Sequence, residues 1–420
     1  MKPIKLWNKN FFLLWQGQFV SQLGNQAFSI AMVFWIKHQT GSASLMGLLM
    51  MLIHLPMVIL GPVAGTIADS YSRRRIIIAC DVLAGVPVII LAMLIFFAPQ
   101  QTSLILVLML IVGLLLGAVR TFFNPAITAA IPDIVPEEKI AAANSLNQSS
   151  VQISTIFGQG LGGYLFMLLG APLLILINGI TYLFSAFSES FISIPQGLPE
   201  KSRIWKEKFA QFKKDTLEGL KIVWRNTGMR SMFFVAAFLN FFIMPLIVLL
   251  PFYVEDFLGV TPDWYGYLLA GFGFGALIGY GFAATLKLSG KRRSRSVILA
   301  MILMTILLAS LSVANKSILS LAIWVGIGIA NGFININIIT LLQTSVPSEL
   351  RGRIFGLLTT ITAGLTPLGL GLGGVVADLT GRNIPLIYGV CGIVLILLSI
   401  TIALLRPFRR FLSDGTIEIK

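Results

Sequence analysis

The chain has 420 residues, of which 56% are hydrophobic and only 11% are charged. Soluble domains average about 25% charged residues, so this composition excludes a water-soluble globular protein. A transmembrane helix needs about 20 apolar residues, and the apolar content is sufficient for about twelve. We therefore predict an all-α integral membrane protein, because transmembrane strands would give shorter segments of alternating polarity.

Apolar runs follow one another along the chain and predict twelve transmembrane helices. They cover about residues 11–36, 45–68, 76–98, 102–123, 145–168, 172–194, 230–254, 262–287, 296–314, 318–343, 354–377 and 384–405. The first run is too long for a cleavable signal sequence, so we expect it to stay as the first helix. Cys80 and Cys391 lie far apart in apolar runs, and we predict no disulfide, no metal site and no cofactor.

The net charge of +14 would suit a nucleic-acid partner in a soluble protein, but its distribution indicates a membrane topology instead. With the N-terminus inside, 27 of the 31 Lys and Arg residues fall on the inner side. The predicted outer loops hold only Lys37, Lys316 and Arg382, and Arg120 lies inside a span. Cytoplasmic loops are enriched in Lys and Arg, so we expect both termini in the cytoplasm and a lipid bilayer, not a nucleic acid, as the partner.

The spans divide into two halves around one long polar segment. We predict an N-terminal six-helix bundle over 1–195, a cytoplasmic linker over 196–229 and a C-terminal six-helix bundle over 230–420. Apolar residues of the linker recur near helical spacing with lysines between them, which is typical of an amphipathic helix on an anionic membrane surface. These residues are Trp205, Phe209, Phe212, Leu220 and Val223. The linker is either a tether between the halves or a regulatory docking site.

The two halves repeat each other at an offset of 211 residues. Val135-Pro136 matches Val346-Pro347 at this offset. Four glycines repeat in the same register, namely Gly158, Gly160, Gly162 and Gly163 with Gly369, Gly371, Gly373 and Gly374. Two six-helix halves with internal repeats are typical of secondary transporters that bind cargo between the halves. The alternative is that the glycines only let helices pack closely.

The loop after the second span carries a recognisable motif. Gly65, Asp69, Arg73 and Arg74 have the spacing of the signature loop of the major facilitator superfamily, which the sequence resembles. Ser70 and Ser72 replace the usual basic residue and glycine. The resemblance implies two pseudo-symmetric six-helix bundles. It also implies that Asp69 caps the eleventh helix and latches one conformation, which a carboxylate at a helix N-terminus can do. Alternatively, Arg73 to Arg75 only set the orientation.

Further motifs make the chain similar to bacterial macrolide-efflux and enterobactin-exporter type permeases. They are Trp15-x-Gly17-Gln18-x-x-Ser21-Gln22-Leu23-Gly24, Thr40-Gly41-Ser42-Ala43, Pro56, Gly61-Pro62-x-x-Gly65, Pro125-Ala126, Ile131-Pro132-Asp133-x-Val135-Pro136 and Ala143-Asn144-Ser145. This similarity implies proton-driven export of bulky amphiphilic small molecules across a prokaryotic inner membrane. Many such permeases carry an acid where this chain has Asn25, and an amide cannot gain and lose a proton.

Ionisable residues within spans are costly, so each is a functional candidate. Asp81 and Arg120 lie at similar depth, and we expect them to pair in a gating role, with Asp69 as a competing partner for Arg120. Glu189 has no evident basic partner and is either a proton carrier or part of a solvated face. His54 could titrate near neutral pH, or could be a neutral side chain bonded to a neighbouring helix.

Neutral amides at mid-depth predict the cargo site. By the resemblance, the first, fourth, seventh and tenth spans line the cavity, and they offer Gln22, Asn25, Gln26, Asn240, Phe241, Asn331, Asn335 and Asn337. Amides among apolar residues suit an amphiphilic small molecule, although they could equally bond neighbouring helices. Gln159 lies in a run that resembles the antiporter motif, where it replaces a proline, and serves either packing or cargo contact.

Other functions are less well supported by the sequence. The chain has only two histidines and no Walker loop or metal-spaced cluster, so we do not expect an enzyme. A passive channel is disfavoured because no charged pore ring is evident. A lipid or lysophospholipid translocator of the same superfamily is the main alternative, since it would share an amide-containing apolar cavity. We expect the protein to act as a monomer.

Overall fold

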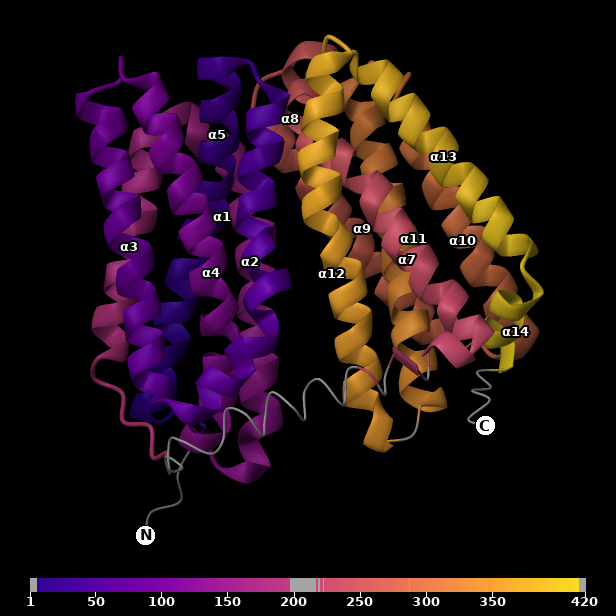
Figure 1. Cartoon of the computed structure of the whole chain (residues 1–420), viewed down its shortest axis with the longest axis horizontal. Helices are drawn as coiled ribbons and strands as arrows, with labels where there is room; N and C mark the ends of the chain where they lie inside the picture. The colour runs from indigo at the N-terminus through magenta and orange to yellow at the C-terminus, as the bar shows by residue number, and fades with distance from the viewer. Residues whose placement is uncertain are drawn as a thin grey trace. The chain divides into compact units, whose positions relative to one another are not determined.

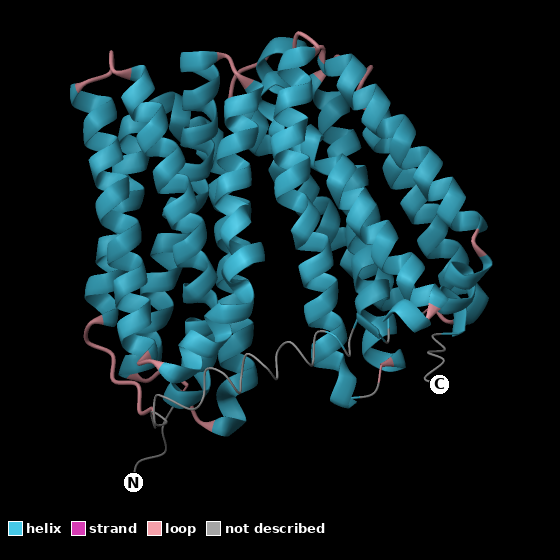
Figure 2. Cartoon of the chain, viewed as in Figure 1, coloured by secondary structure: helices cyan, strands magenta, loops and turns pink. Residues whose placement is uncertain are grey.

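The computed structural model describes residues 6–196, 217, 220–221, 223–286, 288–346 and 348–414. The side chains of Pro62 and Asp69, and those at 348–353, 355, 356 and 359, are not among the described ones. Within the described residues every regular element is a helix, and Figure 2 draws no strand there. The predicted amphipathic helix of the linker lies largely outside the described residues.

The helices form two compact units, and Figure 1 colours the chain by residue number from indigo to yellow. In the described part, one unit comprises residues 6–41 and 48–196, and the other comprises 42–47 with the residues from 217 to 414. The first half of the chain holds α1 (Lys9–Thr40), α2 (Ala43–Ser70), α3 (Arg73–Phe97), α4 (Thr102–Ile134), the 3-10 turn η1 (Glu137–Lys139) and α5 (Ile140–Glu189).

The second half holds the remaining helices. They are α7 (Thr227–Val248), α8 (Leu250–Phe252), the π-helical turn η2 (Tyr253–Phe257), α9 (Asp263–Leu286), α10 (Gly290–Ser310), α11 (Ser317–Ser345), α12 (Ser348–Leu379), α13 (Ile384–Leu404) and α14 (Arg406–Asp414). Each predicted span coincides with one of these helices or with one part of α5. The all-α membrane fold predicted from composition is therefore confirmed.

The described residues contain eleven helices that are long and apolar enough to cross a bilayer, and one of them is long enough to cross twice. The stretch Glu137–Glu189 has 53 residues, more than twice the ~20 that one crossing requires. Gly170 interrupts it with φ 71° and ψ 170°, and Pro172 follows. Only glycine adopts such a φ readily, so the predicted boundary between the fifth and sixth spans lies at this break.

The repeated glycines serve the same purpose in both units, which is close approach of two helices. A Cβ on Gly158 of α5 would lie 2.5 Å from Cβ of Gln26 on α1. At the repeated position in the second unit, a Cβ on Gly369 of α12 would lie 2.7 Å from the backbone oxygen of Phe241 on α7. Close packing of helices, which was the alternative interpretation of these glycines, therefore occurs at the repeated position in both units.

Outward helix faces carry large apolar side chains. Ile90, Phe97 and Leu397 are 53%, 75% and 58% exposed. Exposed apolar side chains of this size are costly in water but suit lipid tails, so these faces contact the bilayer. The buried side chains of each unit form a core of their own, centred on residues such as Ile131 in the first unit and Phe233 in the second.

The structure differs from the predicted spans in two places, where one helix is longer and one additional helix is present. α4 continues to Ile134, through Pro125 and Pro132. A short amphipathic helix, α14, follows the last span and buries Phe408, Phe411 and Leu412 while its arginines stay exposed. Arg293 of α10 holds the end of α14 by donating from Nε to the Leu412 oxygen at 2.9 Å.

Candidate functional site

A polar cavity of about 160 Å³ lies inside the first unit, between α1, α4 and the neighbouring helices. Five of the residues predicted for cargo binding or gating line it, namely Gln22, Asn25, Gln26, Asp81 and Arg120. Gln18, Asn124 and Tyr182 line it as well and were not predicted. The cavity therefore brings together amides from α1, an acid from α3 and a base from α4.

Gln26 and Gln159 form a polar link between α1 and α5. Nε2 of Gln159 donates to Oε1 of Gln26 at 3.3 Å, and Nε2 of Gln26 donates to Oγ1 of Thr155 at 3.4 Å. Gly158, next to Gln159, lets the two helices approach closely enough for these bonds. Both glutamines thus bond a neighbouring helix, and Gln26 also faces the cavity.

The expected pair of Asp81 with Arg120 is wrong in this structure. Both residues line the same cavity, but no salt bridge joins them among the described residues. Asp81 is 2% exposed, whereas the Arg120 side chain is exposed. Asp81 interacts with Ser185 and Glu189 of α5 instead. The reason is the rotation of α3, since Gly85 lies one turn after Asp81 on the same face and packs against the Gly179 oxygen of α5.

Glu189 is buried, not part of a solvated face. Its side chain is 1% exposed, and its Oε1 accepts a hydrogen bond of 2.8 Å from Nε2 of Gln18 on α1. The neighbouring Ser188 accepts from Nε2 of Gln16 at 3.0 Å. The end of α5 is therefore fixed against α1 by two glutamines, and an ionisable group lies in the interior of the unit.

His54 bonds its own helix and not a neighbouring one. Its Nδ1 lies 2.8 Å from the oxygen of Met50, one turn earlier in α2, and the side chain is exposed. A histidine in this position contacts no carboxylate among the described residues. The structure thus gives His54 no link to the buried acids.

The signature loop joins the ends of α3 and α4. Nη1 of Arg73 donates to the Ala129 oxygen at 2.9 Å and forms a salt bridge with Asp133. Arg74 donates to the backbone oxygen of Ser190. Gly65 is exposed on α2, and the predicted cap by Asp69 lies outside the described side chains.

A second cavity, of about 570 Å³, lies inside the second unit between α7, α10, α11 and α12. Its lining is mainly aliphatic and Met side chains, and three of the predicted amides face it: Asn240, Asn331 and Asn335. No Asp, Glu, Lys or Arg is among the lining residues in the described part of the chain. Phe241 and Asn337 do not line it, and the Asn337 amide donates to its own helix at the Phe333 oxygen, 2.9 Å away.

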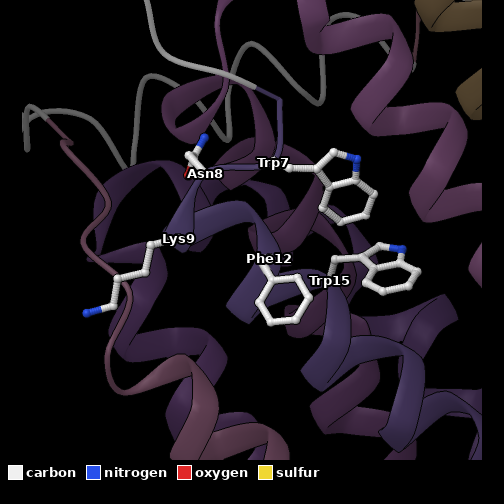
Figure 3. Close-up of a pocket in the computed structure, with 5 residues that line it drawn as sticks. All are labelled: Trp7, Asn8, Lys9, Phe12 and Trp15. Atoms are coloured by element: carbon white, nitrogen blue, oxygen red, sulfur yellow. The ribbon is translucent and has the colours of Figure 1, made fainter. Parts of the chain in front are cut away.

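An aromatic hollow at the start of α1 was not predicted. Figure 3 shows Trp7, Phe12 and Trp15 around one open space, with the Lys9 ammonium pointing away from the rings. The Trp7 and Trp15 rings are 5.3 Å apart and nearly perpendicular. Trp residues are enriched at membrane interfaces, so this cluster fits an anchor at the bilayer surface better than a cargo site.

The described residues contain no group of three or more His, Cys, Asp or Glu side chains that could hold a metal ion. Cys80 and Cys391 are both free and buried. The site chemistry therefore consists of amides, two buried acids and one exposed arginine in the first unit, and of amides in an apolar cavity in the second.

Comparison with known proteins places this architecture in a family. The model of the Major Facilitator Superfamily matches residues 14–367. Macrolide efflux protein A of Streptococcus pyogenes is 24% identical over 387 residues, covering 91% of this chain and 93% of that protein. The multidrug efflux pump Tap of Mycolicibacterium fortuitum is 27% identical over 374 residues, covering 86% and 87%.

Solved structures agree with the fold. The crystal structure of the nucleoside transporter NupG superposes with a TM-score of 0.70 over 93% of this chain and 98% of that one, at 12% identity. At an identity this low, the similarity supports the same fold but not the same function. The described residues contain eleven helices long and apolar enough to cross a membrane, and the family model matches most of the chain, so the chain belongs to the Major Facilitator Superfamily of membrane transporters.

Proposed function

We propose that the protein exports bulky amphiphilic small molecules across a prokaryotic plasma membrane, driven by protons, by alternating access of its cargo site to the two faces. The relatives named for macrolide and multidrug efflux support export of drug-like compounds. The distribution of Lys and Arg supports cytoplasmic termini. We expect one chain to suffice, because a single chain carries both six-helix halves.

The observation that carries this proposal is the lining of the cavity in the second unit. Its volume of about 570 Å³ lies within the range of about 300–1,000 Å³ that is typical of sites for drug-sized ligands. Three amides stand among Met, Leu, Ile and Val side chains, with no charged residue in the described lining. Such a surface holds an apolar body by contact and orients it with a few hydrogen bonds. It offers nothing to neutralise a phosphate or a dicarboxylate.

Growth in the presence of toxic compounds tests the proposal. Cells with and without the protein are compared on a panel that includes erythromycin and hydrophobic dyes, with and without a protonophore. We expect the protein to raise the tolerated concentration of amphiphilic compounds, and the protonophore to abolish this protection. Protection that survives the protonophore would contradict proton coupling.

Uptake of a labelled lysophospholipid, measured in the same cells, separates cargo export from lipid translocation. Cells that gain the labelled lipid but show no protection against any compound would establish the lipid translocator in place of the exporter. Downhill flux of the compounds in both directions, unaffected by the protonophore, would instead indicate a channel.

A further inference from the structure

Two acids meet in the interior of the first unit, where α3 packs against α5. Asp81 and Glu189 are 2% and 1% exposed, and their carboxyl groups interact electrostatically with each other. The hydroxyl of Ser185, which is fully buried, interacts with both. Gly17 of α1 lets that helix pack closely against α5 at the same level, because a Cβ there would lie 2.9 Å from Oγ of Ser185.

Three polar atoms of this group have no hydrogen-bond partner. Oδ2 of Asp81, Oε2 of Glu189 and Oγ of Ser185 are all buried, and none is bonded to any described residue. Ionised carboxylates are acceptors only, so two of them cannot bond each other unless one carries a proton. Unpaired buried acceptors are costly. The Ser185 hydroxyl can donate to only one of the two carboxyl groups, so a proton on either acid would supply a second donor to the group.

The surroundings do not neutralise two negative charges. Among the described residues, no Lys or Arg forms a salt bridge with either acid. The titratable neighbours are Cys80 beside Asp81 on α3, and Tyr182 of α5, which lies within electrostatic reach of Asp81 and Arg120. From α1 the facing group is the uncharged Gln18. Two like charges buried together repel each other strongly, so this environment favours one proton on the pair.

A polar route leads to the pair. Gln18 and Asp81 are part of the wall of the cavity of about 160 Å³, which also exposes Arg120. A cavity of this volume has room for several water molecules, since each occupies about 30 Å³ in the liquid. Asp81 can therefore exchange a proton with water in the cavity, whereas Glu189 is not part of the described lining and accepts from Gln18.

From this geometry we infer that Asp81 and Glu189 share one proton, and that this pair is the site at which the transporter binds and releases its coupling proton. The inference rests on the proposed function for the direction and cargo of transport. It assigns proton coupling to two acids on α3 and α5. The amides of α1, including Asn25, then have no role in proton transfer.

A proton fits this group better than a metal cation. The amide of Gln18 donates to Glu189, so one carboxylate oxygen is already occupied by a hydrogen. Hard cations require many oxygen ligands at once, and the described residues show no cluster of three acids or other ligands here. The experiment below includes Na⁺ so that binding of a cation is distinguished from binding of a proton.

Difference infrared spectroscopy of the purified protein tests the pair without any cargo. We expect a band from a protonated carboxyl group that shifts in D₂O and disappears as the pH is raised. Both Asp81→Asn and Glu189→Gln should abolish it, whereas Glu138→Gln, which removes an exposed acid outside the spans, should retain it. A band that survives in both buried variants, or that Na⁺ removes at constant pH, would overturn the inference.

Transport in proteoliposomes gives the second readout, with radiolabelled erythromycin as the probe. We expect Asp81→Asn and Glu189→Gln to lose accumulation driven by a pH gradient but to retain exchange of erythromycin at equal pH. If the variants keep gradient-driven accumulation, the proton site is wrong, but the proposed export function is not contradicted. If the wild-type protein moves no erythromycin in either mode, the proposed cargo class fails, and the infrared result still decides the proton site.

Discussion

The side-chain amide of Gln18 donates a hydrogen bond of 2.8 Å to Oε1 of Glu189, 171 positions later in the chain. Both side chains are almost fully buried. This bond ties the first third of α1 to the end of α5 and satisfies one of the two oxygens of an interior acid.

Replacing Gln18 by Leu should destabilise the protein by about 1–3 kcal/mol, because a buried carboxyl oxygen loses its only described donor. Thermal unfolding of the purified protein measures the effect. Gln16→Leu is the matched control, since the Gln16 amide donates to the neutral Ser188 hydroxyl at a partly buried site. Equal losses in the two variants would show that the Glu189 oxygen does not depend on Gln18.

Arg73 should act together with Asp133. The two form a salt bridge with side chains that are 17% and 25% exposed, and Arg73 also donates to the Ala129 oxygen. We expect Arg73→Ala to cost about 1–2 kcal/mol, because partial exposure screens the charge while the hydrogen bonds are lost. Arg75→Ala, at an exposed neighbour, should cost less.

A double-mutant cycle measures the Arg73–Asp133 pair itself. Arg73→Ala and Asp133→Asn remove the same contact, so their effects on unfolding should fall short of additivity by about 0.5–1 kcal/mol. Strictly additive losses would mean that the Arg73–Asp133 contact itself contributes nothing to stability.

Much of this fold follows from the sequence, because each span is an apolar segment of fixed minimum length. The break at Gly170 was also predictable, since the apolar run is too long for one crossing and a glycine and Pro172 lie at its centre. α14 was missed, although Phe408, Phe411 and Leu412 have helical spacing, because the segment is too short and too basic to be scored as a span.

The partners of the buried acids could not be read from the sequence in the same way. The depth of Asp81 and Arg120 was estimated from their positions along their helices, but depth does not give rotation. Close packing of Gly85 against Gly179 turns Asp81 towards α5. Gln18 had a usable signal, since it lies one helical turn before Gln22 and two before Gln26, on the face of α1 that lines the cavity.

Gly369 should tolerate no side chain, whereas Gly364 of the same helix should. A Cβ on Gly369 would lie 2.7 Å from a backbone oxygen of α7, and one on Gly364 has nothing within 4 Å. We expect Gly369→Ala to destabilise the protein by about 1–3 kcal/mol through overpacking. Gly364→Ala should be neutral or stabilising by up to about 1 kcal/mol, because alanine is the better helix former. Thermal unfolding of both variants decides, and equal shifts would contradict the packing account.

Amides that line the second cavity should contribute to cargo binding, and an amide outside its lining should not. Asn335→Leu and Asn331→Leu each remove one possible hydrogen bond to cargo, and a bond of about 1 kcal/mol corresponds to about fivefold in affinity. Asn337→Leu is the control, since this amide bonds its own helix outside the lining. The concentration of erythromycin that cells tolerate is the measurement. A similar loss in all three variants would mean that the amides act through helix packing.

Asp378 should hold the first turn of α2. Residues 42–47 and Asp378 belong to the same unit, and the carboxylate accepts from the Ser42 hydroxyl at 2.8 Å, the Ala43 amide at 3.0 Å and the Ser44 amide at 2.8 Å. The first amides of a helix have no partner within it, and a negative charge there is favoured by the helix dipole. The carboxylate thus supplies acceptors that the start of α2 would otherwise lack.

Asp378→Asn keeps the shape but removes the charge and one acceptor, so we expect a loss of about 1–2 kcal/mol and faster hydrogen exchange at the amides of Ala43 and Ser44. Asp263→Asn is the control, because Asp263 also lies at a helix start, that of α9, but its described bond comes from the Thr261 hydroxyl. Since exchange is read residue by residue, a uniform increase across the chain would indicate general destabilisation. An increase confined to the first turn of α2 is the result that the carboxylate cap requires, and unchanged exchange there would mean that the cap contributes nothing to this helix.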